Sequence, residues 1–321
     1  MALIYAGIDE AGYGPLLGPL VVACTVWRIV DWSAGDGRPD LWDAMSSASA
    51  RELRGAAGRV VVADSKKLKG RGGKGRELRH LELGVLSHLA ATGVEVETDL
   101  DLLSVLGGEF EDRPWYSGPA MPVARGCDGD EVRIAGNCLR RAMADAGVEL
   151  LAIRCLVVGE RAFNRLVSEH GGKGVTTAFT VARLIAGVAK RWGGEGKPIR
   201  VVGDRLGGRL SYTSLLERAL PEATVEVEEQ SAARCRYRVA QSDIGVTFQP
   251  EAELAHYPVA LASMSAKLVR ELAMARFNRY WCARRPELKP TAGYRQDAAR
   301  WLRDAHDLVS DADRAAMIRQ A

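Results

Sequence analysis

The sequence predicts a mixed α/β fold in a single large domain, and three observations support this. The 321 residues are 47% hydrophobic and 26% charged, which is enough to bury a sizeable core. Apolar, β-branched runs come first, and a tight turn separates two of them. Further along the chain, such runs alternate with segments of helical periodicity. Strands that begin as a meander and then alternate with helices indicate a central mixed sheet flanked by helices.

The N-terminal half opens with the strands that should form the middle of this sheet. Residues 3–9 and 19–30 are apolar, and the short turn between them predicts a hairpin. Residues 31–50 predict a polar loop with room for a short helix. The elements expected next are a strand at 59–63, a Gly-rich basic loop at 70–75, a helix near 76–92 and a strand at 94–98.

The C-terminal half alternates strands and helices after a stretch, 104–130, that is rich in Gly, Pro and acidic residues. The expected elements are helices near 131–146 and 175–192, strands at 150–158, 199–203, 224–229 and 235–240, and a long amphipathic helix over about 259–283. Pro286 and Pro290 should end that helix. A final helical segment is expected at 294–320, so the C-terminal portion is predicted to be helical.

Charge and cysteine usage exclude several classes of protein. A net charge of +3 gives no global polycation signal, so nucleic-acid affinity would have to come from local basic runs such as residues 66–79. The six cysteines form no CxxC pair and suit a reducing cytosol. No apolar run reaches membrane-spanning length and no signal peptide precedes Leu3. We expect a cytoplasmic, monomeric protein that does not bind membranes.

Carboxylates directly follow two predicted strands. Asp9 and Glu10 come after the first strand, and Asp204 ends the strand that begins at Ile199. Adjacent like charges repel, and Mg²⁺ or Mn²⁺ is the usual partner for such clustered oxygens. Two such ions would suit in-line attack on a phosphodiester. The alternative is a pair of solvated carboxylates on a hairpin turn. Because strand geometry points Asp9 and Glu10 to opposite faces, the backbone would have to bend, and the glycines that follow allow this.

Several motifs, in order, resemble those of the type 2 ribonucleases H, the bacterial HII and HIII enzymes. GIDEAGYGPLLGPLVVA resembles the opening Asp-Glu-x-Gly-x-Gly motif of these families, and Asp64-Ser65-Lys66-Lys67-Leu68 matches their DSKKL signature. The strand 199–204 resembles the one that carries their third acidic residue. ASMSAK, starting at Ala262, resembles the start of a family helix, with Glu271 at the fourth acidic position. Gly293-Tyr294 resembles a C-terminal Gly-Tyr.

The resemblance implies a ribonuclease H-like fold over residues 1–321 and endonucleolytic cleavage of RNA paired with DNA, leaving 3′-hydroxyl and 5′-phosphate ends. The substrate would be an RNA–DNA hybrid or duplex DNA that contains ribonucleotides. Two ions, Mg²⁺ or Mn²⁺, would be held by the four carboxylates Asp9, Glu10, Asp204 and Glu271. Other implied roles are sensing of the ribose 2′-hydroxyl by Gly12, Tyr13 and Gly14, backbone contacts by Ser65, Lys66 and Lys67, and packing on a sugar by Tyr294.

The sequence also departs from the family pattern. HII enzymes have Arg where this chain has Tyr13, whereas HIII enzymes lack that Arg and use Glu at the fourth acidic position. We therefore expect an HIII-like preference for runs of ribonucleotides. The family's usual Lys before Gly-Tyr is Ala292 here. Segments near 104–148 and 206–258 read as insertions, and 286–321 as a C-terminal helical extension.

Other interpretations remain open for individual residues and for the whole chain. Asp204 could cap a turn, Glu271 could form a surface ion pair with Lys267, Lys66 and Lys67 could be solvated, and Tyr294 could belong to the core. Residues 70–75 fit GxGxxG but do not directly follow a strand, and Gly174 replaces the P-loop Ser or Thr, so neither nucleotide motif is expected. The alternative function is a nucleic-acid-binding ribonuclease H paralogue with weak or altered catalysis.

Overall fold

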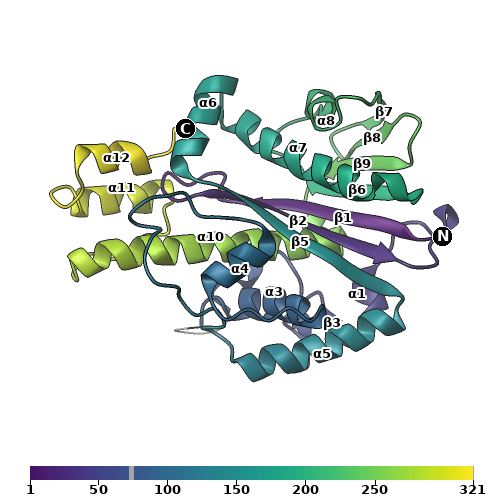
Figure 1. Cartoon of the computed structure of the whole chain (residues 1–321), viewed down its shortest axis with the longest axis horizontal. Coiled ribbons are helices and arrows are strands. Elements are labelled where there is room, and N and C mark those ends of the chain that lie inside the picture. The colour runs from purple at the N-terminus through teal and green to yellow at the C-terminus, as the bar shows by residue number, and fades with distance from the viewer. Residues whose placement is uncertain (72–75, 321) are drawn as a thin grey trace.

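A central sheet of seven strands organises the molecule, in the order β5-β2-β1-β6-β9-β8-β7. The computed structural model describes residues 1–71 and 76–320 (Figure 1). The strands are β1 Leu3–Ala11, β2 Leu20–Ile29, β5 Val148–Val158, β6 Ile199–Asp204, β7 Val225–Gln230, β8 Cys235–Val239 and β9 Ile244–Gln249. A separate two-stranded sheet pairs β3 (Ser49–Ala50) with β4 (Val60–Val61).

The sheet is mixed, as the sequence predicts. β1 pairs antiparallel with β2, which confirms the hairpin, and parallel with β6. β6 in turn pairs parallel with β9, while β8 is antiparallel to both β9 and β7. Strands β1 and β6 therefore run side by side towards the same edge, where Asp9 and Glu10 lie near the end of β1 and Asp204 is the last residue of β6.

Helices cover both faces of the sheet (Figure 1). One face packs against α6 (Glu160–His170), α7 (Lys173–Trp192) and α8 (Thr213–Ala219). The other packs against α10 (Tyr257–Arg284) and α3 (Arg79–Ala91), with α5 (Gly129–Asp145) behind α3. The shorter elements are η1 Ala34–Asp36, α1 Leu41–Ala44, α2 Ser65–Leu68, α4 Asp99–Leu106, η2 Gly193–Glu195, α9 Ala252–Ala255, α11 Arg295–Asp304 and α12 Asp311–Met317. No helix among the described residues is long and apolar enough to cross a bilayer.

Helix α10 is buried on nearly all sides rather than amphipathic, which differs from the expectation. Its first half lies directly on β1, where a Cβ on Gly7 would come within 2.2 Å of the Pro258 carbonyl carbon. Only glycine permits this close approach of strand and helix. Even Arg276 is buried, because Asp99 pairs with it at 2.6 Å. Arg270 and Arg276 are therefore part of the interior, whereas Arg284 at the end of the helix is exposed.

Three local predictions differ from the structure. The strand expected at 59–63 is reduced to β4, and residues 94–98 contribute only an isolated bridge at Thr98. Residues 206–258, read as an irregular insertion, supply β7, β8 and β9, of which β9 was not expected at all. β9 has small or polar residues at alternate positions, and its pairing with β6 stabilises it as a strand.

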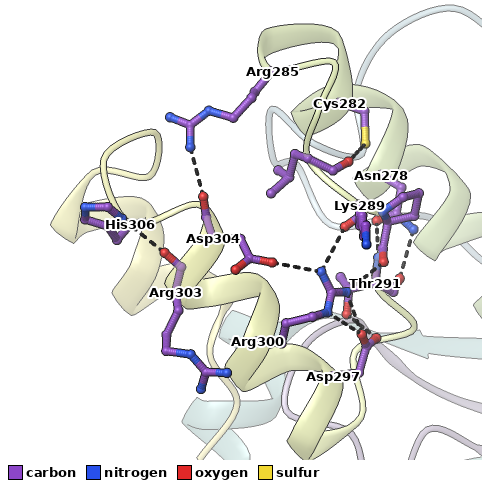
Figure 2. Close-up of polar contacts among 12 residues, drawn as sticks. Asn278, Cys282, Arg285, Lys289, Thr291, Asp297, Arg300, Arg303, Asp304 and His306 are labelled. Carbon is purple, nitrogen blue, oxygen red and sulfur yellow. Dashed lines mark hydrogen bonds and ion pairs between the residues drawn. The ribbon is translucent and has the colours of Figure 1, made fainter.

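The C-terminal helices pack on the far half of α10 around Phe277, Trp281 and Trp301. Asp297 connects this part to the preceding loop by accepting hydrogen bonds from Thr291 Oγ1 and Ala292 N, both at 2.7 Å, and from Arg300 (Figure 2). These contacts fix the loop that leads into Tyr294. The predicted helical C-terminal portion is thus confirmed as two helices rather than one segment.

Candidate carboxylate site

Asp9 and Asp204 lie side by side at the ends of two adjacent parallel strands. The last paired residues, Ile8 and Gly203, immediately precede them, and both side chains occupy the face of the sheet that α10 covers. The Glu10 amide donates to Asp9 Oδ1 at 2.8 Å, and the Ala252 amide donates to Asp204 Oδ1 at 3.2 Å. The strand pairing therefore places Asp9 and Asp204 at the same edge of the sheet.

Burial raises the pKa of each of these carboxyls, and repulsion from neighbouring carboxylates adds to the rise at Asp9 and Glu10. Burial is the largest cause of the raised pKa of Asp9, followed by the negative charge of Glu10, while a hydrogen bond from Ser263 opposes the rise. Burial and then Asp204 raise the pKa of Glu10 to about 7, against the opposing charge of Lys66. Burial also raises the pKa of Asp204. Asp9 and Glu10 thus both interact with Asp204, although neighbouring residues of a strand point to opposite faces of the sheet.

A fourth carboxylate, Glu253, joins this group, and the sequence reasoning did not identify it. Burial raises the pKa of Glu253, and the charges of Asp204 and Asp64 add to the rise. Its Oε2 is buried and has no hydrogen-bond partner among the described residues. Glu253 lies in α9, shortly after the end of β9. The strand-end rule that selected Asp9 and Asp204 would have found it, had β9 been predicted. We call Asp9, Glu10, Asp204 and Glu253 the carboxylate cluster.

Glu271, which was expected as the fourth ligand, is bound by two lysines instead. Its Oε1 lies 2.8 Å from Lys69 Nζ and 2.8 Å from Lys267 Nζ. These cations keep the pKa of Glu271 below its usual value although burial acts to raise it. Glu271 is eight residues beyond Ser263 on α10, which corresponds to roughly 12 Å along a helix. The ion pair with Lys267, left open as an alternative, is thus present, and Glu253 rather than Glu271 lies near Asp204.

The Asp64-Ser65-Lys66-Lys67 motif forms the start of α2, next to the carboxylate cluster. Asp64 caps the helix by accepting from the Lys66 amide at 2.9 Å. Ser65 is buried and accepts a hydrogen bond from Ser263 at 3.0 Å, so its hydroxyl does not face solvent. Lys66 and Lys67 are exposed. Although partial burial acts to lower it, the pKa of Lys66 is raised by Asp64 and then Asp9. The predicted basic loop lies partly outside the described residues, at 72–75.

The turn of residues 12–18, called here the glycine turn, is held by hydrogen bonds from Arg319. Gly12 has φ +93°, a conformation that favours glycine. The buried Arg319 guanidinium donates to the carbonyl oxygens of Gly12, Tyr13 and Gly18 at 2.5, 3.3 and 3.3 Å. The sequence predicted the turn, but it contained no signal that a residue 300 positions away would hold it.

The predicted substrate-contacting residues surround this turn. Gly14 is exposed, and the Tyr13 ring faces Lys173 Nζ at 5.2 Å. Tyr294 is 46% exposed, so it is not a core tyrosine. Its ring lies beside the Arg270 guanidinium at 5.4 Å. The Gly293 carbonyl accepts from the Leu16 amide at 2.8 Å, which holds Tyr294 next to the glycine turn.

The donor chemistry of the carboxylate cluster suits a hard divalent cation. All four side chains supply carboxylate oxygens, the ligands that Mg²⁺ and Mn²⁺ prefer, and the buried Oε2 of Glu253 has no other partner in the described chain. As placed, however, no three His, Cys, Asp or Glu side chains of residues 1–71 and 76–320 form a ready metal-binding group. The residues therefore fit the chemistry of such an ion without being gathered around one point.

Comparisons with known proteins give structural likeness only. No protein-family model matches the sequence, and no curated protein matches it. Among solved structures, the ribonuclease HII of Archaeoglobus fulgidus, solved with PCNA, is 16% identical with a TM-score of 0.47, over 99% of this chain and 94% of that one. Ribonuclease H2 of Pyrococcus horikoshii is 14% identical with a TM-score of 0.40, over 96% and 88%. Bst ribonuclease HIII, solved with Mn²⁺, is 14% identical with a TM-score of 0.41, over 99% and 66%.

Proposed function

We propose that this chain is a divergent type 2 ribonuclease H, an endonuclease that cleaves the RNA strand of RNA–DNA hybrids and leaves 3′-hydroxyl and 5′-phosphate ends. The observation that carries the proposal is the meeting of Asp9, Glu10 and Asp204 at one edge of the sheet. These carboxylates, which match the family motifs, lie beside Lys66 of the DSKKL motif. Each short motif is weak evidence alone, and their proximity in the fold makes the combination more specific.

The four members of the carboxylate cluster would hold Mg²⁺ or Mn²⁺. When bound, these ions would activate water and stabilise the leaving oxygen of the phosphodiester. The high pKa values of Asp9 and Glu10 mean that part of the cluster is protonated near neutral pH until a cation offsets the repulsion. Binding of the ion would therefore release protons.

Residues around the cluster would bind and orient the nucleic acid. Lys66 and Lys67 are exposed and cationic, and would contact backbone phosphates. The backbone N–H and C=O groups of the glycine turn would sense the ribose 2′-hydroxyl, which distinguishes RNA from DNA. The exposed ring of Tyr294 would pack on a neighbouring sugar. Ser65 would act indirectly, because its hydroxyl is bound to Ser263.

One observation favours a second candidate, a nucleic-acid-binding paralogue with weak catalysis. Within the described part of the chain, the carboxylates do not already form a metal-binding group. In that case the same surface would bind hybrids, and cleavage would be slow even with Mn²⁺ at millimolar concentration.

Cleavage of labelled substrates separates the two candidates. The full chain is incubated with Mn²⁺ or Mg²⁺ and either a continuous RNA–DNA hybrid or duplex DNA with one ribonucleotide. The proposed enzyme gives products with 3′-hydroxyl ends, and Asp9→Asn and Asp204→Asn abolish them. Tight hybrid binding without metal-dependent cleavage would support the paralogue instead. Activity that survives both substitutions would contradict the proposed site.

A further inference from the structure

One side of the sheet is left uncovered beyond β6. Strands β6, β9 and β8 bury alternate side chains such as Val201, Val246 and Tyr237 in the core beneath α7 and α8. The residues between them, including Arg200 and Arg236, point to the opposite face. On that face α10 lies over β1 and β2 (Figure 1). The arginines of the later strands are exposed or half-exposed there.

A groove of about 480 Å³ runs over this open face and is lined by arginines. Four guanidinium groups line it, those of Arg38, Arg200, Arg234 and Arg236. No Asp or Glu side chain lines it within the described residues. The Trp32 ring forms part of the wall, with the Arg200 guanidinium 5.9 Å from its centre. We call this feature the arginine groove.

The ion pairs of these arginines leave donors free. Arg200 pairs with Asp243 at 2.7 Å, Arg234 with Glu229 at 2.6 Å and Arg236 with Glu228 at 3.5 Å. These three carboxylates lie outside the lining of the groove. A guanidinium has five N–H donors, so one carboxylate partner does not exhaust it.

Arg38 makes no ion pair among the described residues. Burial lowers the pKa of His256, which lines the groove, and the positive charge of Arg38 lowers it further. The groove is therefore more cationic than its paired arginines alone would make it.

The arginine groove continues directly into the carboxylate cluster. Gln249 lines the groove and stands opposite Asp204 in the β6–β9 register. Val202 also lines the groove and lies two residues before Asp204 on the same face of β6, which corresponds to about 7 Å along a strand. An extended polyanion lying in the groove would thus reach the carboxylate cluster without leaving this face of the sheet.

We propose that the arginine groove binds the backbone phosphates of a nucleic-acid strand that extends from the cleavage site. Arginine binds phosphate through two parallel hydrogen bonds, and an aromatic wall suits sugar or base contacts. Continuity with Asp204 favours a nucleic acid over an acidic protein. The proposal deepens the proposed function and rests on it for the identity of the strand, but binding can be measured without cleavage.

The test compares two double variants of the full chain that lose the same charge. Arg38→Gln/Arg236→Gln changes the groove while leaving both hydrogen bonds of Arg234 to Glu229 Oε2 intact. Arg133→Gln/Arg140→Gln is the matched control on the exposed face of α5. Affinity for a labelled hybrid of about 30 base pairs is measured without divalent ions over a range of salt concentrations. Thermal melting confirms that each variant is folded, and Arg38→Gln alone serves if the double variant is not.

The groove variant should bind the long hybrid roughly three- to tenfold more weakly, and the slope of log affinity against log salt should fall by about 1 to 2. A hybrid of about 8 base pairs, too short to span both sites, should lose less affinity. Unchanged salt slopes, or an equal change in the control, would overturn the proposal. So would equally tight binding of poly-glutamate, since the groove would then accept any polyanion.

The outcomes also separate this inference from the proposed function. If no metal-dependent cleavage occurs but the groove variant still weakens hybrid binding, the nuclease assignment fails and the groove stands. If the wild type cleaves and the groove variant binds and cleaves long hybrids as well as the wild type does, the groove assignment fails and the nuclease stands.

Discussion

The Nζ atom of Lys69 lies 2.8 Å from Oε1 of Glu271 and connects the end of α2 to the middle of α10. Glu271 therefore neutralises lysines, whereas Glu253 is held among carboxylates. We predict that Glu253→Gln lowers metal-dependent cleavage by roughly two orders of magnitude. Glu271→Gln should instead keep cleavage within about threefold and lower the unfolding free energy by about 1–3 kcal/mol, because Lys267 is left buried without its anion.

Single-turnover cleavage and chemical unfolding of the two variants check this assignment. Asp204→Asn serves as the reference for loss of a cluster carboxylate. A larger loss of cleavage in Glu271→Gln than in Glu253→Gln would show that Glu271, and not Glu253, is the fourth metal-binding carboxylate.

Arg319 is predicted to position the glycine turn. Its guanidinium donates to three turn carbonyls, and charge-assisted hydrogen bonds contribute about 1.5–3 kcal/mol each. Arg319→Ala should therefore reduce discrimination between an RNA–DNA hybrid and duplex DNA by roughly tenfold or more. Arg319→Lys should recover little, because an ammonium cannot reproduce the fork of donors.

The ratio of hybrid to DNA binding, measured without divalent ions, is the readout for Arg319. Asn164→Ala removes a contact of the same tail at Ile318 and should change that ratio less. If Arg319→Ala lowers the melting temperature and leaves the ratio unaltered, Arg319 has only a structural role.

Tyr13 is predicted to set the preference between long hybrids and single ribonucleotides. A side-chain anchor on phosphate is missing here, and one charge-assisted hydrogen bond is equivalent to about ten- to a hundredfold in affinity. A single ribonucleotide offers one productive register, whereas a long hybrid offers many. Continuous hybrids should thus be cleaved faster, with Mn²⁺ at least as effective as Mg²⁺. Tyr13→Arg should raise single-ribonucleotide cleavage, and Tyr13→Phe should not.

Equal rates on the two substrates would contradict this preference. If Tyr13→Arg does not raise cleavage at a single ribonucleotide, Tyr13 has a role of its own. Its ring faces Lys173 at 5.2 Å, so an arginine at this position would have to turn away from that ammonium.

Lys66, Lys67 and Lys69 are predicted to contact phosphates beside the carboxylate cluster. The triple alanine variant should bind hybrids more weakly, and its salt slope should be shallower by roughly 1 to 3, since each lost phosphate contact removes about 0.9. Arg133→Ala/Arg140→Ala/Arg141→Ala on α5 is the matched control. The same slope for the lysine variant and the wild type would exclude this role.

His88 is predicted to make stability depend on pH. It is fully buried, with Nδ1 2.6 Å from the Gly84 carbonyl and Nε2 2.8 Å from Tyr257 Oη. The carbonyl can only accept, so Nδ1 carries the proton and Nε2 accepts from the tyrosine. Burial lowers the pKa of His88 to about 4. The unfolded chain, with a pKa near 6.5, therefore binds the proton first, and stability is lost as pH falls from about 6.5 to about 4.

The comparison of wild type with His88→Gln isolates this effect from other titrating groups. The stability advantage of the wild type should shrink by on the order of 3 kcal/mol across that pH range. An advantage for His88 that does not vary with pH would refute the prediction.

Local sequence pattern is sufficient to predict most strands of the main sheet, though not β9 or the spatial order, and part of the site. The apolar run before Asp9 and the run before Asp204 each had to be a buried strand, because their side chains suit no solvated structure. That these two strands are adjacent and parallel, so that their carboxylates meet at one edge, is given by the strand pairing in the structure. Local pattern was also sufficient for the β1–β2 hairpin.

Tertiary structure alone decided which distant residues complete that site. β9 exists because it pairs with β6, and only that pairing brings Glu253 to Asp204. Lys69 and Lys267 bind Glu271 from two segments of the chain, and Arg319 returns from the C-terminus to hold Gly12. These contacts join segments up to 307 residues apart. Neither periodicity nor capping acts over such separations, so packing of the folded chain determines them.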